Sequence, residues 1–196
     1  GQLVDGATGA HIWAERYEGT LDDIFGLQDR ISASVAGAVA GQVERAEIER
    51  AARMPTESLD AYDYYLRGRA QFNRGTREGM ADGLALFEKA IALDPDFASA
   101  YAMAAWCLFW RRANGWMADR AAEPAEGARL APRAVELGRD DAVALTRGGH
   151  ALAHFTGDLE GGIALIVRAL ALHPNHAPAW YLGGYLRVGR GELDGA

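Results

Sequence analysis

Two histidines stand four residues apart, at His150 and His154, a spacing at which one helix can present two imidazoles to a zinc ion. The zinc-protease motif requires a glutamate directly after its first histidine, and Ala151 occupies that position. No cysteine or carboxylate nearby completes a convincing set of ligands. We therefore expect the two histidines to pack inside the protein or to face a groove, and we predict no metal site.

Other residues that could carry catalysis lack the context that their chemistry requires. Cys107 stands between two large apolar residues with no adjacent base, which favours a buried and unreactive thiol. Gly189 and Gly191 follow no predicted strand and lack the spacing of a dinucleotide-binding loop. Asp22 and Asp23 are better explained as acidic residues at the start of a helix than as a metal-binding pair. The sequence therefore predicts a non-catalytic segment without a cofactor.

Composition and charge narrow the classes of function further. The 196 residues are 49% hydrophobic and 24% charged, with a net charge of −7, as in a folded globular protein. The acidic balance disfavours a surface that binds nucleic acid, and one cysteine cannot form a disulfide framework. No apolar run approaches the ~20 residues that cross a membrane. Alanine makes up about a fifth of the chain, which favours closely packed helices.

The start of the chain differs in pattern from the rest. Two short runs at 2–5 and 10–17 flank a glycine-containing turn, which predicts a β-hairpin over residues 1–20. An isolated hairpin is marginally stable in water, so this one needs a partner surface. Because the chain starts with Gly1 and ends within a helical pattern, we expect it to be a fragment of a longer protein.

A long amphipathic helix is predicted over residues 21–53. Thr20 is a suitable N-cap, and after it apolar residues recur every three or four positions along one face. Pro55 ends the helix within a short linker at residues 54–57.

Beyond residue 57 the sequence repeats itself. The segment 89–101 matches 168–180 in residue type almost position for position, and a weaker third copy lies at 133–145. Corresponding alanines in the three copies are 44 and then 35 residues apart. In the two stronger copies the end of an apolar helix is followed by a proline and then by an alanine-rich helix. A period near 34 built from helix pairs is the pattern of tetratricopeptide repeats.

Residues 58–196 thus resemble tetratricopeptide (TPR) repeats. Gly68 stands where paired helices touch in this family, whereas Asp140 replaces the usual proline and Thr146 the usual aromatic residue. The resemblance implies an all-α fold, a TPR α-solenoid of helix-turn-helix repeats, preceded by the long helix and the short β-hairpin. The predicted repeats span residues 58–96, 97–141, 142–175 and, truncated, 176–196. Their predicted helices are 59–73, 80–93, 98–113, 121–137, 142–155 and 159–172.

A second resemblance lies at the start of the chain. Residues 2–17 and 22–29 are similar to the last hairpin and helix of the TolB-like amino-terminal domain. In bacterial multidomain proteins that domain often precedes TPR repeats. Such proteins frequently begin with a class III adenylate or guanylate cyclase domain, or with a winged-helix DNA-binding domain.

These resemblances imply a protein–protein interaction module in the C-terminal regulatory region of a bacterial signalling protein, with a class III adenylate cyclase as the favoured parent. The alternatives are the C-terminal arm of a winged-helix transcription regulator and a free-standing TPR scaffold. The segment itself is expected to bind neither nucleic acid nor membrane. A cyclase parent favours the cytoplasm, and a membrane helix upstream would instead place the repeats in the periplasm.

The expected binding surface is the concave face that the first helices of TPR repeats line, where peptides or partner segments bind. Tyrosine, tryptophan and arginine dominate binding hot spots, and repeat positions place several on this face. The lysine and asparagine set that binds chaperone tails is not reproduced. The alternative is that several of these aromatic residues pack between repeats. The predicted groove residues are Tyr62, Tyr65, Arg69, Asn73, Trp106, Phe109, Trp110, Arg147, His154, Tyr181 and Tyr185.

Residues 1–50 are predicted to form a homodimer, because the edge of the hairpin and the apolar stripe of the helix need cover. The expected contact residues are Trp13, Ile24, Leu27, Ile31 and Val35. Light scattering at several concentrations should give a mass that approaches twice the 21.1 kDa of the chain. A mass near 21.1 kDa throughout would instead favour a helix that folds back on the first repeat of the same chain.

Overall fold

The computed structural model describes residues 60–191 continuously. Before them it describes residues 2–4, 9, 11–14 and 16 and the helical positions 26, 28, 31, 32, 35, 39, 41–43, 45, 47 and 48. The chain divides into two compact units, Gly1–Glu49 and Arg50–Ala196, and each is treated by itself.

In the first unit, two short strands pair antiparallel: β1 (Gln2–Val4) and β2 (His11–Ala14). Their register places Gln2 opposite Ala14, and an irregularity follows Leu3. Of the predicted contact stripe, Ile31 and Val35 are helical and half-buried. Ile24, Leu27 and the side chain of Trp13 lie outside what the structure describes, so the predicted dimer contact stays a prediction.

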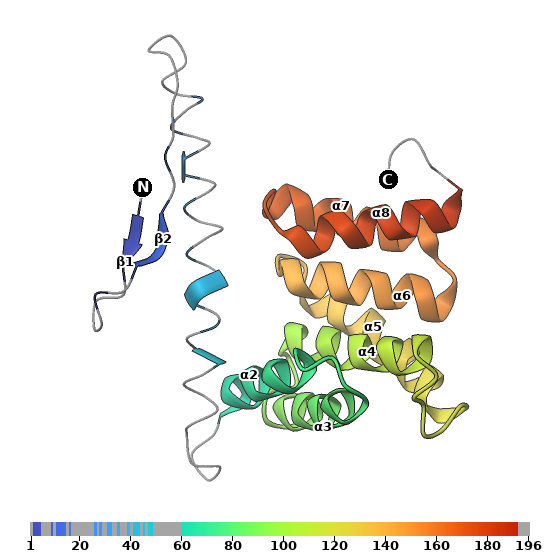
Figure 1. Cartoon of the computed structure of the whole chain (residues 1–196). Helices are drawn as coiled ribbons and strands as arrows, with labels where there is room; N and C mark the ends of the chain where they lie inside the picture. The colour runs from blue at the N-terminus through green and yellow to red at the C-terminus, as the bar shows by residue number, and fades with distance from the viewer. Residues whose placement is uncertain are drawn as a thin grey trace. The chain divides into compact units, whose positions relative to one another are not determined.

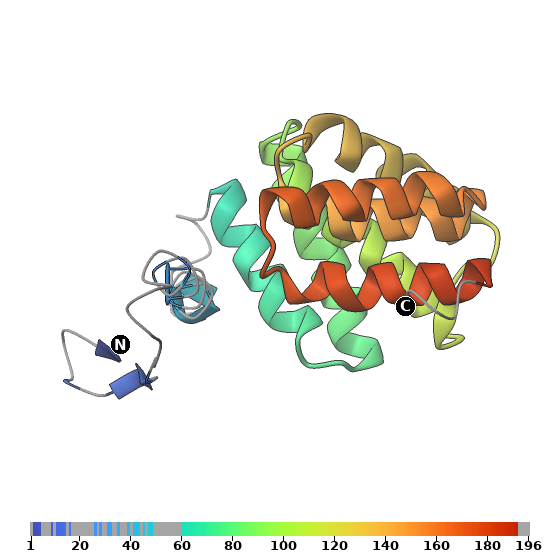
Figure 2. The ribbon, with the colours of Figure 1, turned by 90° about the horizontal axis from the view of Figure 1, so that it is seen from above.

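The second unit is a stack of helices (Figure 1). Each helix packs on the next in the sequence, and alternate helices α2, α4, α6 and α8 also contact one another in that order. Figure 2 shows the stack from above, with α7 and α8 running side by side. The helices are α2 (Ala61–Phe72), α3 (Arg77–Leu93), α4 (Ala98–Ala113), α5 (Ala122–Leu137), η3 (Ala144–Gly148) continuing into α6 (Gly149–Thr156), α7 (Leu159–Leu172) and α8 (Ala177–Arg190).

These bounds confirm the helix pairs predicted from the repeats, since each of the six predicted helices is observed within three residues of its expected ends. Local interactions at the helix ends explain several of these bounds. Asp60 caps α2 in a capping box with Asp63, and Asp158 accepts a hydrogen bond from the Gly161 amide at the start of α7. Gly157 ends α6 in the left-handed region, at φ 81°, which glycine adopts without strain.

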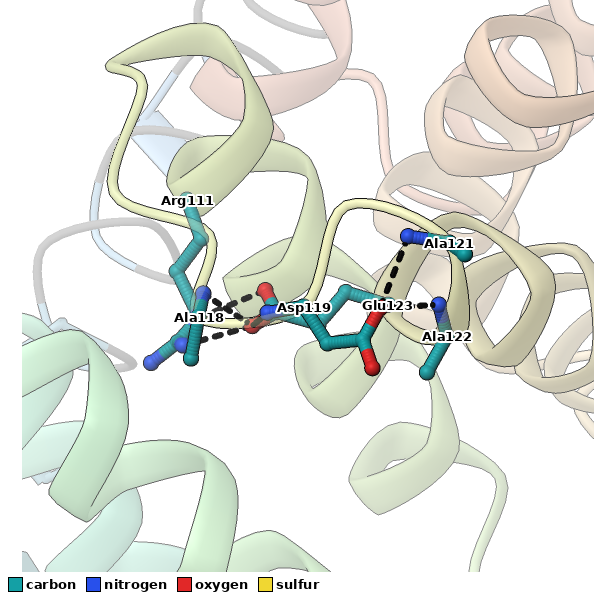
Figure 3. Close-up of polar contacts among 6 residues, drawn as sticks. All are labelled: Arg111, Ala118, Asp119, Ala121, Ala122 and Glu123. Carbon is teal, nitrogen blue, oxygen red and sulfur yellow. Dashed lines mark hydrogen bonds and ion pairs between the residues drawn. The ribbon is translucent and has the colours of Figure 1, made fainter.

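The long connection between α4 and α5 is held by one arginine. Arg111 donates two hydrogen bonds to the Glu123 carboxylate, at 2.8 and 2.7 Å, and the amides of Ala118 and Asp119 donate to the same side chain (Figure 3). Asp119 in turn caps the start of α5. The hydrogen bonds from Arg111 are the main cause that lowers the pKa of Glu123. This loop lengthens the second repeat, which accounts for the wider spacing seen in the sequence.

Glycines set the distance between paired helices. A Cβ atom built on Gly68 of α2 would lie 2.6 Å from the ring of Phe87 on α3, and that ring is fully buried. One on Gly127 of α5 would lie 2.4 Å from the ring of Phe155 on α6. The predicted role of Gly68 as the small residue between paired helices is therefore confirmed.

The substitution Gly68→Ala should destabilise the protein by about 1–3 kcal/mol, because the added methyl group must displace a buried ring. Gly189→Ala is the matched control: this glycine is also in a helix, but it is exposed and has no atom within 4 Å of its Cβ position. There the change should be neutral or stabilise by up to about 1 kcal/mol. Urea unfolding followed by circular dichroism measures both, and equal effects would contradict the packing argument.

Candidate partner-binding site

Several of the predicted groove residues form one aromatic cluster between α4 and α6. The rings of Trp106 and Phe109 stack with centroids 4.6 Å apart, and His150 meets both edge-on at 4.9 and 4.8 Å. Phe109 also meets the ring of His154 at 4.6 Å. Trp106 and Phe109 are buried, 1% and 8% exposed, so they form the interior side of the cluster, and Trp110 is its more exposed member on α4.

Arg147 connects this cluster to α8. Its guanidinium carbon lies 4.7 Å from the centroid of the Trp106 ring and 5.9 Å from that of Tyr181, and its Nη1 donates a hydrogen bond of 2.9 Å to the Tyr181 hydroxyl. Tyr181 and Tyr185 are 55% and 66% exposed, and the Tyr185 ring lies 5.7 Å from His150. The structure thus brings together predicted residues from three repeats.

The predicted residues of α2 lie in a second group. Tyr65 is buried against Phe97, with ring centroids 5.0 Å apart, and its hydroxyl accepts a hydrogen bond of 3.0 Å from Arg69. Tyr62, which is half exposed, packs on Tyr65. Arg69 is close enough to Arg147 to lower the pKa of that residue. Asn73 is the exposed C-cap of α2, and its described contacts with this group are through its backbone N–H, which donates to the Arg69 carbonyl.

The electrostatics of this region are set by arginine. Burial lowers the pKa of Arg147, the Tyr181 hydroxyl opposes that change, and the charge of Arg69 lowers it further. Burial also lowers the pKa of His150 to about 4, with His154 and Arg147 adding to the effect. The pKa of His154 falls through burial and the charge of Arg112. The two histidines are therefore neutral near pH 7, and the positive charge resides on the arginines.

Several buried polar atoms in the same region have no hydrogen-bond partner in the described part of the chain. They are Trp106 Nε1, Thr146 Oγ1, both ring nitrogens of His150, and Nε2 of His154 and His176. Unpaired buried polar groups are rare and costly in proteins. Thr146 and His176 are not among the residues predicted for the site. The spacing of His150 and His154 leads to the expectation that both pack inside the protein or face a groove, and His150 is buried, at 1% exposure.

Among the described residues no group of three or more His, Cys, Asp or Glu side chains is arranged to hold a metal ion. Within the same part of the chain, no helix is long and apolar enough to cross a membrane. Cys107 is buried, and burial strongly raises the pKa of its thiol.

A separate depression of about 710 Å³ lies where the turns after α3 and α5 meet. It is rich in carboxylates, and these have partners. Asp96 pairs with Arg133, and Asp140 pairs with Arg168. Asp141 accepts hydrogen bonds from the Ser99 hydroxyl and from two backbone amides that follow it in the chain. The two ion pairs join neighbouring repeats, and together with the contacts of Asp141 they give the acidic residues there a structural role.

No family model matches the chain. It is 31% identical over 101 residues to "Putative adenylate cyclase 3" of Rhizobium meliloti (strain 1021), and the match covers 52% of this chain but only 17% of that protein. Among solved structures, the first TPR of Spaghetti (RPAP3) bound to an HSP90 peptide is 20% identical to this chain, with a TM-score of 0.49. The match covers 67% of this chain and 94% of the Spaghetti chain.

The TPR protein YrrB, described as having an unusual peptide-binding site, is 22% identical, with a TM-score of 0.46, and covers 83% of this chain and 76% of its own. Both scores are below 0.5, so the description of the second unit as TPR-like rests on the helix pairs and sequence repeats of this chain.

Acidification should unfold this protein in part through His150. Its pKa is about 4 when folded and ~6.5 when unfolded, so the unfolded state binds the proton first, and stability is lost as the pH falls from about 6.5 toward 4. Between pH 7 and 5 this histidine should contribute a loss of about 2 kcal/mol. In His150→Leu, the difference in unfolding free energy between these pH values should shrink by that amount.

The matched control is His173→Leu, in the exposed turn before α8. Urea titrations at the two pH values measure the wild type and both variants. A wild-type pH dependence in His150→Leu would contradict the assignment of a buried, neutral imidazole.

Proposed function

We propose that residues 58–196 are a non-catalytic protein–protein interaction module whose partner binds over the inner helices α4, α6 and α8. The observation that carries the proposal is the arginine–aromatic cluster around Arg147, in which buried rings support two exposed tyrosines, Tyr181 and Tyr185. Side chains that offer large apolar area and a polar group dominate binding hot spots.

The proposed parent is a class III adenylate cyclase with this segment in its C-terminal regulatory region. The similarity to a protein named as a putative adenylate cyclase supports it, although the match spans 17% of that relative. The interpretation of residues 1–20 as the end of a TolB-like domain belongs to the same proposal. A winged-helix regulator and a free-standing scaffold remain the alternatives. Upstream sequence distinguishes them, since a cyclase requires paired metal-binding aspartates and a winged helix requires a basic recognition helix.

The other parts of the proposal depend on this parent. The chain divides into a hairpin at 1–20, a long helix at 21–53, a linker at 54–57 and repeats at 58–196. A cyclase acts on ATP, which favours a cytoplasmic segment, and a membrane helix upstream would instead place the repeats in the periplasm. Self-association through residues 1–50 would bring two such segments together.

The ligands for this test are peptides selected from a random phage-displayed library on the wild-type chain. The double variant Tyr181→Ala with Tyr185→Ala should bind them more weakly, by about tenfold or more, because each substitution removes a large contact surface. The matched control is Leu93→Ala with Val167→Ala, which removes exposed apolar side chains of α3 and α7. Fluorescence polarisation with the selected peptides measures the affinities. A selection that yields no peptide, or equal affinities for both double variants, would contradict the proposed site.

A further inference from the structure

Arg147 differs from the arginines for which the structure describes an ion pair. Arg111, Arg129, Arg133 and Arg168 each pair with a carboxylate. Arg147 is half-buried, and its described contacts are the Trp106 ring, the Tyr181 ring and the Tyr181 hydroxyl. A guanidinium has five N–H donors, and one described hydrogen bond uses one of them. A partly buried charge without a counter-ion is costly, and an anion would offset that cost.

The backbone at this position is itself unusual. Residues Ala144–Gly148 form a π-helical turn, and Arg147 is the one of the five that is not buried. Single π-turns within α-helices are rare and occur frequently at functional sites. This turn departs from the regular TPR helix at the very repeat where Thr146 replaces the usual aromatic residue.

The charges that act on the site favour an anion. Arg69 lowers the pKa of Arg147, and Arg112 lowers that of the nearby His154, so three arginines contribute positive potential in a chain of net charge −7. The carboxylate of Asp141 raises the pKa of the nearby His176. It already accepts hydrogen bonds from the Ser99 hydroxyl and from two backbone amides that follow it in the chain. The Trp106 ring contacts both Arg147 and the His150 ring, and Trp106 Nε1 and the His150 nitrogens have no hydrogen-bond partner among the described residues.

We propose that Arg147 binds a side-chain carboxylate of an acidic segment in the partner protein, with Tyr181 and Tyr185 contacting the residues beside it. This inference rests on the proposed function and names the chemistry of the partner. A guanidinium matches a carboxylate because its planar array of donors can form two parallel hydrogen bonds. Tyr181, which contacts Arg147, and Tyr185, which contacts His150, are exposed and can supply apolar contact to the residues beside that carboxylate.

The test uses a random peptide library displayed on phage as internal segments. Such peptides have no free C-terminal carboxylate, so only Asp and Glu side chains can provide one. Peptides selected on the wild-type chain should be enriched in Asp or Glu at one position. This enrichment should disappear on selection with Arg147→Met. The matched control is Arg168→Met, which removes the same charge from an exposed arginine on α7 outside the cluster, and the enrichment should persist there.

A synthetic peptide from the selection, capped at both ends, should bind the wild type about tenfold or more weaker when its acidic residue is replaced by the amide. The same replacement should change binding to Arg147→Met by less than about twofold, since the partner charge is already gone. The wild-type comparison does not depend on the stability of the variant.

The outcomes separate the inference from the function on which it rests. Peptides that bind without a preferred acidic residue, or that bind Arg147→Met unchanged, would overturn the assignment of Arg147 while the interaction module stands. A library that yields no binder would overturn the interaction module itself, and the inference with it.

Discussion

The close approach of helices at glycine is the constraint on which the second unit depends. Gly68 meets the buried ring of Phe87, and Gly127 meets Phe155, at distances that leave no room for a Cβ atom. At Gly149 the space is taken by Leu165 in the same way. Since each contact joins neighbouring helices, the glycines fix the spacing of the stack. Two of these contacts position α6 against α5 and α7, and α6 continues from the turn that carries Arg147.

The helices could be predicted from the sequence because their signals are local and repeated. The alanines at helix contacts recur with the repeat, and so do the prolines at the turns of the two stronger copies. Each of these residues, like Gly68, acts on structure within a few residues of itself or at one helix contact. The orientation of side chains was harder to predict. Trp106 and Phe109 are among the predicted groove residues, with packing between repeats as the alternative, and both are buried, as is every residue of α4 from Ala98 to Phe109. Position within a repeat does not show which face of such a helix is covered.

The π-turn at Ala144–Gly148 had no signal in the sequence beyond Thr146 in place of an aromatic residue. Apart from glycine, the residues of this turn are common in helices. A single wide turn is also too short to change the spacing of apolar residues in a way that the sequence would show. Its effect is nonetheless local and specific, because the turn carries Arg147 and leads directly into the helix that carries His150 and His154. The centre of the candidate site therefore lies where the chain departs from its own repeat.

The chain separates its charges by location. Carboxylates gather at the turns between repeats, where Asp96, Asp140 and Asp141 are satisfied by arginines, a hydroxyl or backbone amides. The inner helices carry arginine beside histidines that burial keeps neutral. Because His150 and His154 contribute no charge near neutral pH, the potential at Arg147 does not depend on them in that range. The carboxylates at these turns thus have partners other than Arg147, which supports the proposal that an acidic segment of a partner supplies its counter-charge.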